Sequence, residues 1–245
     1  MGMMDLSPAS VAACIFGASG GIGAALAGQL AASDAISLVH AGGRGPVAQG
    51  AKIRPFAFDL EDEASIAAAA RSMDDVPPRI IIVATGLLHG DDLRPEKSLR
   101  DQSGDAYARL FAVNATGPAL IAKHMLVRPP RQGRLVFAAQ SARVGSISDN
   151  RLGGWHAYRA SKAALNMIMR NIAIELARIN PEAIAVTLHP GTVDSALSQP
   201  FQRNVAPEKL FPPELSARHL LSVIDGLGPE ASGQCYGWDG AVIPF

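Results

Sequence analysis

Short, almost continuously apolar segments recur along the chain and alternate with segments of helical periodicity. The apolar segments predict β-strands at Val11–Phe16, Ala35–Val39, Ile53–Phe58, Ile80–Ala84, Arg134–Ala138 and Ala183–Leu188. Strands that are apolar on both sides are typical of a parallel sheet with helices on both faces. The alternation therefore predicts a doubly wound α/β fold with right-handed crossovers, formed as a single domain over residues 1–245.

The segments between the strands carry the helical pattern. Helices are predicted over Glu63–Ser72, Ala106–Leu126 and Tyr158–Ile179, and around the periodic apolar residues Ile22, Leu26 and Leu30. Residues 190–213 contain several prolines and little periodicity, which predicts a long loop over the domain. Loops of this length are often functional, so we expect this one to contact the substrate.

Composition narrows the class of protein. Hydrophobic residues make up 48% of the 245 residues, and the 22 Lys and Arg balance the 22 Asp and Glu. Such a balance gives no sign of nucleic-acid binding, and no apolar stretch is long enough to span a bilayer. The amino terminus lacks a charged segment followed by an apolar run, so we expect a cytoplasmic protein. Cys14 and Cys235 lie in strand-like segments and are expected to be buried thiols.

A glycine-rich turn joins the first strand to the first helix. It reads Gly17-Ala18-Ser19-Gly20-Gly21-Ile22-Gly23. Free N–H groups and the positive dipole end of the helix suit a pyrophosphate at such a turn. Ala24 and Ala25 follow instead of the Lys-Ser/Thr pair of a nucleoside-triphosphate loop. The alternative is an ordinary tight turn, but the position after the first strand favours a dinucleotide site.

The end of the second strand bears on the choice of dinucleotide. No Asp or Glu lies in His40-Ala41-Gly42-Gly43-Arg44 to hold the ribose 2′-hydroxyl of NAD. His40 and Arg44 can instead face a 2′-phosphate, which predicts a modest preference for NADP. The alternative is that both are solvated loop residues.

A tyrosine and a lysine four residues apart open a long predicted helix. Tyr158 and Lys162 share a helical face, so the phenol and the ammonium group can act on one site. A nearby positive charge favours phenolate and lowers the pKa of a tyrosine. Ser141 follows the strand Arg134–Ala138, at the edge where parallel sheets present functional groups. Each residue taken alone has an ordinary structural explanation, a surface pair or a turn serine.

Together, these motifs resemble the short-chain dehydrogenase/reductase family. The resemblance also covers an acidic residue after the third strand, a turn after the fourth strand, an asparagine in a helix and a Pro-Gly motif. These are Asp59, Ala84-Thr85-Gly86, Asn114 and Pro190-Gly191. It implies catalytic roles for Asn114, Ser141, Tyr158 and Lys162. It implies that the dinucleotide contacts Gly17, Ser19, Gly20, Gly21, Ile22, Gly23, Asp59, Leu60, Ala84, Thr85, Gly86, Tyr158, Lys162, Pro190, Gly191, Thr192, Val193 and Ser195, besides His40 and Arg44.

The resemblance implies a fold and a mechanism. The fold is a Rossmann-like, seven-stranded parallel sheet whose last strand is Gln234–Trp238. In the mechanism, a carbonyl oxygen lies between Ser141 and Tyr158, and hydride moves between the nicotinamide and the carbonyl or alcohol carbon while Tyr158 donates or accepts the proton. Lys162 lowers the tyrosine pKa and binds ribose, and Asn114 holds a water for the proton relay.

The resemblance is strongest to the C-factor (C-signal) branch and to sniffer-type carbonyl reductases. It is carried by Gly153–Tyr158 and the ending Trp238–Phe245. This branch leaves open an alternative function, a cofactor-binding signalling protein with little or no turnover. Gly20 stands where many NADP-dependent relatives have a basic residue, so NAD stays open as the cofactor.

Three further expectations follow. The spacing of Ser141 and Tyr158 is a few residues longer than usual in the family, so a loop at residues 149–154 should bulge near the site. Apolar residues on more than one face of the two longest helices predict a homodimer or homotetramer. The substrate pocket should be mostly apolar, with walls formed by Leu87, Leu88, Val144, Trp155, Leu197 and Phe201.

Overall fold

A single, mostly parallel sheet forms the centre of the protein, which a computed structural model describes for residues 11–245. Seven parallel strands run in the order β3-β2-β1-β4-β5-β6-β9. The sheet has eight strands rather than the expected seven, because β10 pairs antiparallel with β9. The strands are β1 (Val11–Phe16), β2 (Ile36–Gly43), β3 (Ile53–Ala57), β4 (Ile80–Val83), β5 (Leu135–Gln140), β6 (Ala183–His189), β9 (Cys235–Gly237) and β10 (Val242–Ile243).

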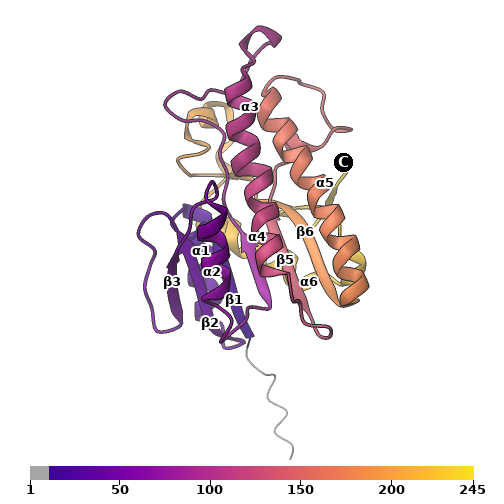
Figure 1. Ribbon diagram of the computed structural model, residues 1–245. Coiled ribbons are helices and arrows are strands. Elements are labelled where there is room, and N and C mark those ends of the chain that lie inside the picture. Colours follow the sequence, from indigo (N-terminus) through magenta and orange to yellow (C-terminus); the bar gives the residue numbers. More distant parts are fainter. Residues whose placement is uncertain (1–10) are drawn as a thin grey trace, which may run out of the picture.

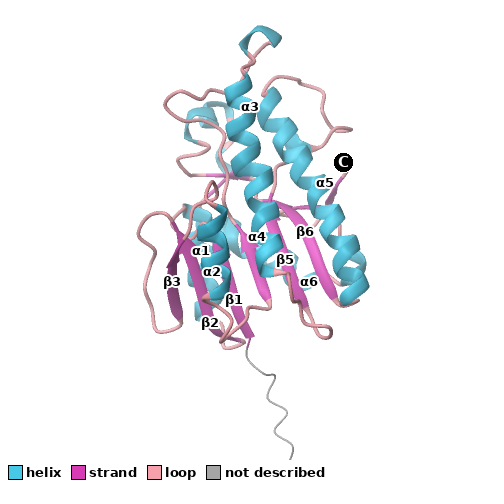
Figure 2. Ribbon diagram, viewed as in Figure 1, coloured by secondary structure: helices cyan, strands magenta, loops and turns pink. Residues whose placement is uncertain are grey.

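Helices cover both faces of this sheet (Figures 1 and 2). They are α1 (Gly21–Ala32), α2 (Glu63–Arg71), α3 (Gly104–Phe111), α4 (Gly117–Met125), α5 (His156–Ile179) and α6 (Pro213–Gly226). One buried cluster joins α1 and α6 to the sheet, and a second joins α2, α4 and α5 to its other face. Neighbouring strand residues serve opposite clusters, Ile15 the first and Phe16 the second, as the alternation of a strand requires. The doubly wound prediction is confirmed.

The helix expected over Ala106–Leu126 is interrupted. A π-helical turn, Ala112–Thr116, separates α3 from α4, and the Gly117 N–H bonds back to Ala112 O. Pro118 has no N–H to close an α-helical bond to Asn114 O, which accounts for the wider turn. The turn carries Asn114, a predicted site residue, toward the end of the sheet.

The segment before α5 makes a tight left-handed path. Gly153, Gly154 and Trp155 all have positive φ, at 63°, 64° and 52°. Trp155 is the only non-glycine residue with positive φ among residues 11–245. This segment contains the extra residues expected to bulge, and Leu152 there is 91% exposed.

The long loop expected at residues 190–213 holds some regular structure. Two-residue strands β7 (Thr192–Val193) and β8 (Leu210–Phe211) pair in parallel, and short 3₁₀ turns at Gln199–Asn204 and Pro207–Lys209 lie between them. Both cysteines are buried free thiols. Within residues 11–245, no helix is long and apolar enough to cross a membrane.

Candidate active site

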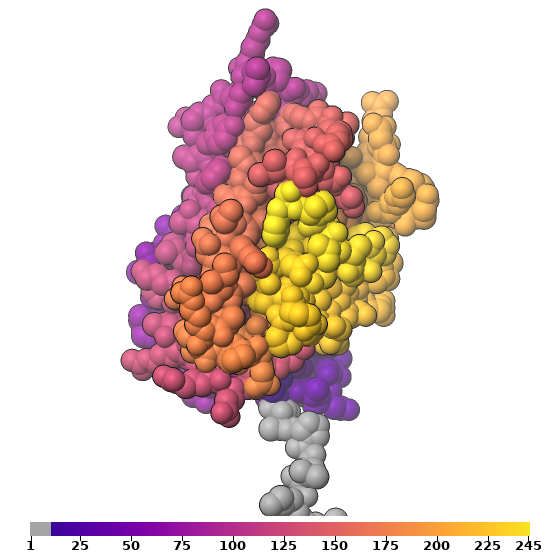
Figure 3. Space-filling view, turned by 90° about the vertical axis from the view of Figure 1, so that its right-hand side faces the viewer, coloured from indigo at the N-terminus to yellow at the C-terminus, as the bar shows by residue number. Residues whose placement is uncertain are grey.

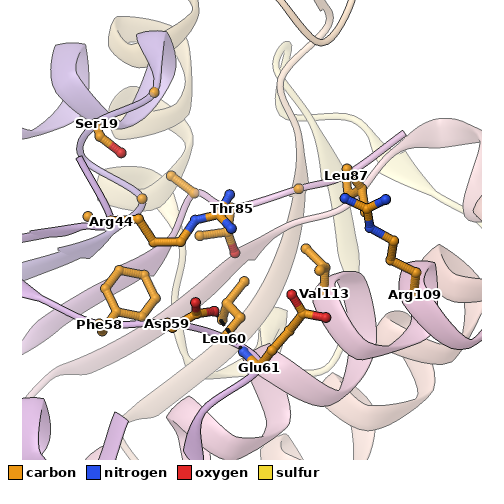
Figure 4. Close-up of a pocket in the computed structure, with 15 residues that line it drawn as sticks. Ser19, Arg44, Phe58, Asp59, Leu60, Glu61, Thr85, Leu87, Arg109 and Val113 are labelled. Atoms are coloured by element: carbon orange, nitrogen blue, oxygen red, sulfur yellow. Dashed lines mark hydrogen bonds between the residues drawn. The ribbon is translucent and has the colours of Figure 1, made fainter. Parts of the chain in front are cut away.

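A cavity of about 270 Å³ opens where β1, β2, β3 and β4 end (Figure 4). The order of strands reverses between β1 and β4, and open α/β sheets bind ligands at such a point. Nine residues predicted to contact the dinucleotide line this cavity: Gly17, Ser19, Gly20, Arg44, Asp59, Leu60, Ala84, Thr85 and Gly86.

The glycine turn forms one wall. Gly17 has a φ of 98°, and a Cβ there would lie 3.0 Å from the carbonyl carbon of Ala84. A Cβ at Gly23 would overlap the Gly17 carbonyl oxygen, so Gly23 allows α1 to pack against the turn. Gly21, Ile22 and Gly23 form the first turn of α1 and do not line the cavity. Gly20, the N-cap residue of α1, does line the cavity, and no side chain caps the helix there.

These features fit a dinucleotide. The buried Thr85 hydroxyl has no hydrogen-bond partner among residues 11–245, so a polar ligand group can bond to it. The uncapped helix start suits phosphate, and the Asp59 carboxylate lies at the cavity wall (Figure 4). A nicotinamide dinucleotide bound here would supply or accept hydride.

The prediction that His40 faces a phosphate is wrong. Its ring is buried in β2 and its Nε2 lies 3.1 Å from Val76 O, on the path into β4. Burial lowers the pKa of His40, so the ring is neutral at pH 7. Arg44, the first residue after β2, does line the cavity (Figure 4).

Five lining residues were missed by sequence reasoning: Gly43, Phe58, Glu61, Arg109 and Val113; a sixth, Leu87, had been predicted as a wall of the substrate pocket. Arg109 comes from α3 and points toward Leu87 on the opposite side of the cavity from Arg44 (Figure 4). The available signal was spacing, since Arg109 and Val113 lie one helical turn apart, just before Asn114.

Gly86 connects the cavity to the expected catalytic residues. A Cβ placed there would lie 3.9 Å from both Asn114 Oδ1 and Lys162 Nζ, and 3.8 Å from Leu197 Cδ1. Glycine therefore leaves room where the two polar groups meet. Asn114 and Lys162 do not themselves line the cavity, but both side chains lie close to Gly86, which does.

Tyr158 and Lys162 lie close together and are both buried. Lys162 Nζ lies 5.9 Å from the centre of the Tyr158 ring and donates a hydrogen bond of 2.8 Å to Gln140 O. Burial lowers the pKa of Lys162 to about 8. Burial also raises the pKa of Tyr158, opposite to the lowering expected from the lysine, because loss of water outweighs a charge at this distance.

Ser141 directs its hydroxyl into a buried network. Its Oγ donates to Asn166 Oδ1 at 2.8 Å, and Thr187 Oγ1 donates to the same oxygen at 3.0 Å. Asn166 was not predicted, although its position four residues after Lys162 on α5 places both on one helical face. The network fixes the serine beside Gln140, the residue that binds Lys162.

The Asn114 side chain is already engaged. Its Oδ1 accepts from Leu87 N–H at 2.8 Å, and its Nδ2 donates to Leu87 O at 2.8 Å and to Ser161 Oγ at 3.1 Å. Both amide hydrogens are thus used, and the side chain braces the segment after β4 against α5. A relay water at Asn114 stays a prediction.

The six predicted substrate walls belong to one cluster, which also contains Tyr158. The ring centres of Trp155 and Phe201 lie 4.9 Å apart, and those of Trp155 and Tyr158 lie 6.1 Å apart. His89 Nε2 lies 3.1 Å from Leu197 O and ties the long loop to the segment after β4. An apolar, aromatic surface therefore surrounds the tyrosine.

The Pro-Gly motif lies beside this region and does not line the cavity. Ser216 donates to Pro190 O at 2.9 Å, and Gly191, with a φ of 79°, packs against the rings of Phe211 and Trp238. Thr192 and Val193 form β7, and Ser195 Oγ donates to Val193 O at 3.3 Å. Dinucleotide contacts of Pro190, Gly191, Thr192, Val193 and Ser195 stay a prediction.

Comparison with known sequences identifies relatives. A family model described as short chain dehydrogenase matches residues 11–206. C-signal of Myxococcus xanthus is 41% identical over 140 residues, 56% of this chain and 78% of that protein. The 1-hydroxy-2-glutathionyl-2-methyl-3-butene dehydrogenase of a Rhodococcus species is 33% identical over 142 residues, 58% of this chain and 59% of that protein. The match to this second relative thus spans little more than half its length.

Comparison with solved structures supports the fold. The NADPH-bound carbonyl reductase from chicken fatty liver superposes with a TM-score of 0.82 at 22% identity, covering 98% of this chain and 96% of that one. The carbonyl reductase Sniffer of D. melanogaster superposes with a TM-score of 0.81 at 19% identity, covering 96% of this chain and 99% of that one. At these identities the likeness concerns the architecture.

The buried lysine generates a prediction about stability. The lowering of the Lys162 pKa from 10.5 to about 8 corresponds to a destabilisation of the folded protein by about 3 kcal/mol. Replacing the lysine by methionine removes this destabilisation, but it also removes the hydrogen bond to Gln140 O, which stabilises the folded protein by about 1 kcal/mol. Because the pKa of Lys162 is lower in the folded than in the unfolded protein, the destabilisation is complete below pH 8 and disappears as the pH rises toward 10.5. We expect Lys162→Met to unfold at a higher temperature than the unaltered protein at neutral pH, by calorimetry without added dinucleotide.

The difference in unfolding temperature between Lys162→Met and the unaltered protein should become smaller at about pH 9.5, where Lys162 is neutral in the folded protein. Lys123→Met, which removes an exposed ammonium group, is the control. An unfolding temperature of Lys162→Met at or below that of the unaltered protein at neutral pH would mean that the hydrogen bond outweighs the desolvation.

Proposed function

The chain belongs to the short-chain dehydrogenase family of NAD(P)-dependent oxidoreductases, and we propose that it interconverts a carbonyl compound and the corresponding alcohol. The observation that carries the proposal is the position of Gly86, which lines the dinucleotide-type cavity and where a Cβ would lie 3.9 Å from both Lys162 Nζ and Asn114 Oδ1. A hydride donor and a proton source can therefore meet at one place.

The proton chemistry follows from burial. A substrate oxygen would lie near Ser141 and Tyr158, with the hydroxyl of Ser141 turning from Asn166 toward the developing charge. The raised pKa of Tyr158 keeps its proton in place until the oxygen becomes basic. Lys162, with a pKa of about 8, can then return a proton to the phenolate at neutral pH. In alcohol oxidation each transfer is reversed.

The alternative, a cofactor-binding signalling protein with little turnover, is not favoured. A protein that only binds a dinucleotide gains nothing from burying Tyr158 and Lys162, which costs stability. The resemblance to C-signal concerns sequence and carries no statement about turnover.

The proposed cofactor is NADP. Arg44 lines the cavity at the end of β2, and none of the ion pairs among residues 11–245 involves it. A planar guanidinium group matches a 2′-phosphate. With His40 turned into the interior, Arg44 alone supports this preference.

A homo-oligomer is also proposed. Met167 and Ile174 on α5 are 62% and 44% exposed, and Ile147 and Phe245 nearby are 76% and 47% exposed. Figure 3 shows that α5 and the C-terminal segment share one face of the molecule. Symmetric pairing of such a face is the commonest way to cover it.

Tyr158→Phe tests the proposed chemistry. The change keeps the ring and removes the acidic proton, so the rate of NADPH-dependent reduction of aldehydes and ketones should fall about 10²–10⁴-fold. Absorbance of the reduced nicotinamide measures the rate, and NADPH binding should be unchanged. Tyr107→Phe is the control, because it removes the hydroxyl of a half-buried tyrosine of α3 that donates to Gln102 and has no part in the proposed proton transfer. Activity of Tyr158→Phe within a few-fold of the unaltered enzyme would falsify the role of Tyr158.

Arg44→Ala tests the cofactor. Loss of a charge-assisted hydrogen bond of about 1.5–3 kcal/mol predicts NADPH binding weaker by about 10- to 150-fold, with NADH binding little changed. Fluorescence titration gives both dissociation constants. Arg54→Ala removes an equal charge that is paired with Asp75. If the unaltered protein binds NADH more tightly than NADPH, the NADP proposal is wrong and the hydride-transfer proposal stands.

Met167→Glu tests the oligomer. Light scattering should give the mass of a dimer or tetramer for the unaltered protein at micromolar concentration. A charge in the apolar face should shift Met167→Glu toward the monomer. Leu99→Glu, at an exposed apolar residue outside this face, should leave the mass unchanged. A monomeric unaltered protein contradicts the proposal.

A further inference from the structure

A buried carboxylate lies outside the chemistry described so far. Glu96 is only 2% exposed, although it comes from the irregular segment between β4 and α3. Among residues 11–245 no cationic side chain forms an ion pair with it. Its two carboxylate oxygens lie 3.3 and 3.4 Å from the Ala157 nitrogen, at the start of α5. A buried carboxylate needs such a partner.

The start of α5 lacks a cap of its own. The residue at the N-cap position is Trp155, whose side chain makes no capping hydrogen bond. Its left-handed backbone follows two glycines that also have positive φ. Helix starts usually have Ser, Thr, Asp or Asn at this position to bind the first N–H groups. Here the cap is supplied by a residue about sixty positions earlier.

Glu96 binds the helix start twice. Its backbone carbonyl accepts from the Trp155 N–H at 2.6 Å, and its carboxylate accepts from the Ala157 N–H. Ala157 is the residue before Tyr158, and its side chain is fully buried in the cluster around the tyrosine. A carboxylate at this place also interacts favourably with the helix dipole.

The same contact ties two parts of the site together. The segment that ends at Glu96 begins at Gly86 and carries Leu88 and Leu93, which pack in the cluster with Tyr158. We propose that Glu96 is a positioning residue that fixes the first turn of α5, and thereby the phenol of Tyr158, relative to Gly86. The expected effect on kcat rests on the proposed function, whereas the expected ordering of the first turn of α5 rests on the geometry alone.

Three variants distinguish the effects of the negative charge, the side-chain length and the hydrogen-bond acceptor of Glu96. Glu96→Ala removes the acceptor, Glu96→Asp keeps the charge but shortens the side chain, and Glu96→Gln keeps an acceptor oxygen without the charge. Hydrogen exchange followed by mass spectrometry should show faster exchange at residues 155–160 in Glu96→Ala and Glu96→Asp. With NADPH and a carbonyl substrate, kcat should fall about 10- to 100-fold in both, because small displacements of a reacting group have large effects.

Two further readouts distinguish positioning from folding. The dissociation constant for NADPH should stay unchanged, because Glu96 lies outside the dinucleotide cavity. Glu96→Gln should restore kcat to within about threefold of the unaltered enzyme, since an amide oxygen can accept from Ala157 N–H.

Asp101→Ala is the matched control. Asp101 is an exposed carboxylate of the same segment, and it accepts from the backbone N–H groups of Lys97 and Ser98 at a 3₁₀ turn. Its loss should leave kcat and exchange at residues 155–160 unchanged. The proposal is overturned if exchange at 155–160 is unaltered in Glu96→Ala, if kcat is retained in both Glu96→Ala and Glu96→Asp, or if Asp101→Ala has the same effects. An unaltered protein without activity would instead overturn the proposed function, while the exchange result still tests the cap.

Discussion

A positive charge held inside the protein constrains the whole catalytic end. Lys162 is 3% exposed and, among residues 11–245, its ammonium group donates to one acceptor, the carbonyl of Gln140. That carbonyl is available because β5 ends at Gln140. The contact also requires the following turn to approach α5 closely, and a Cβ at Gly145 would lie only 2.8 Å from the Lys162 Cβ. Strand end, turn and helix are therefore placed by one buried group.

The sequence predicted the features that depend on local pattern. The strand segments are apolar because both sheet faces are covered, and β1, β4, β5 and β6 were found within a residue or two of their ends. The glycine turn was predictable because a backbone with φ of 98° and a close contact to Ala84 leaves few other residues possible at Gly17. The mostly apolar surroundings of Tyr158 were also predicted, and the six expected residues lie in one cluster with it.

Features that depend on side-chain direction or distant contacts could not be read in this way. His40 and Arg44 are both near the end of β2, but His40 lies within the strand and is covered by the segment that contains Val76, whereas Arg44 follows the strand end at Gly43 and meets the cavity. Asn166 and Glu96 carry no motif, and their partners Ser141 and Ala157 are identified only once α5 is docked. The pKa of Tyr158 was misjudged because sequence shows a neighbouring charge but not the loss of water.

The two edges of the central sheet limit how copies of the fold can associate. On one side, the outermost strand β3 contains Arg54, whose side chain is charged, and Pro55, which has no N–H to offer a further strand. On the other side, the antiparallel strand β10 is only two residues long. Short, charged or proline-containing edges resist strand addition, and so protect against fibrillar aggregation. If copies of this protein assemble, these edges direct the contacts to its helical faces, where side chains meet and symmetry limits the number of subunits.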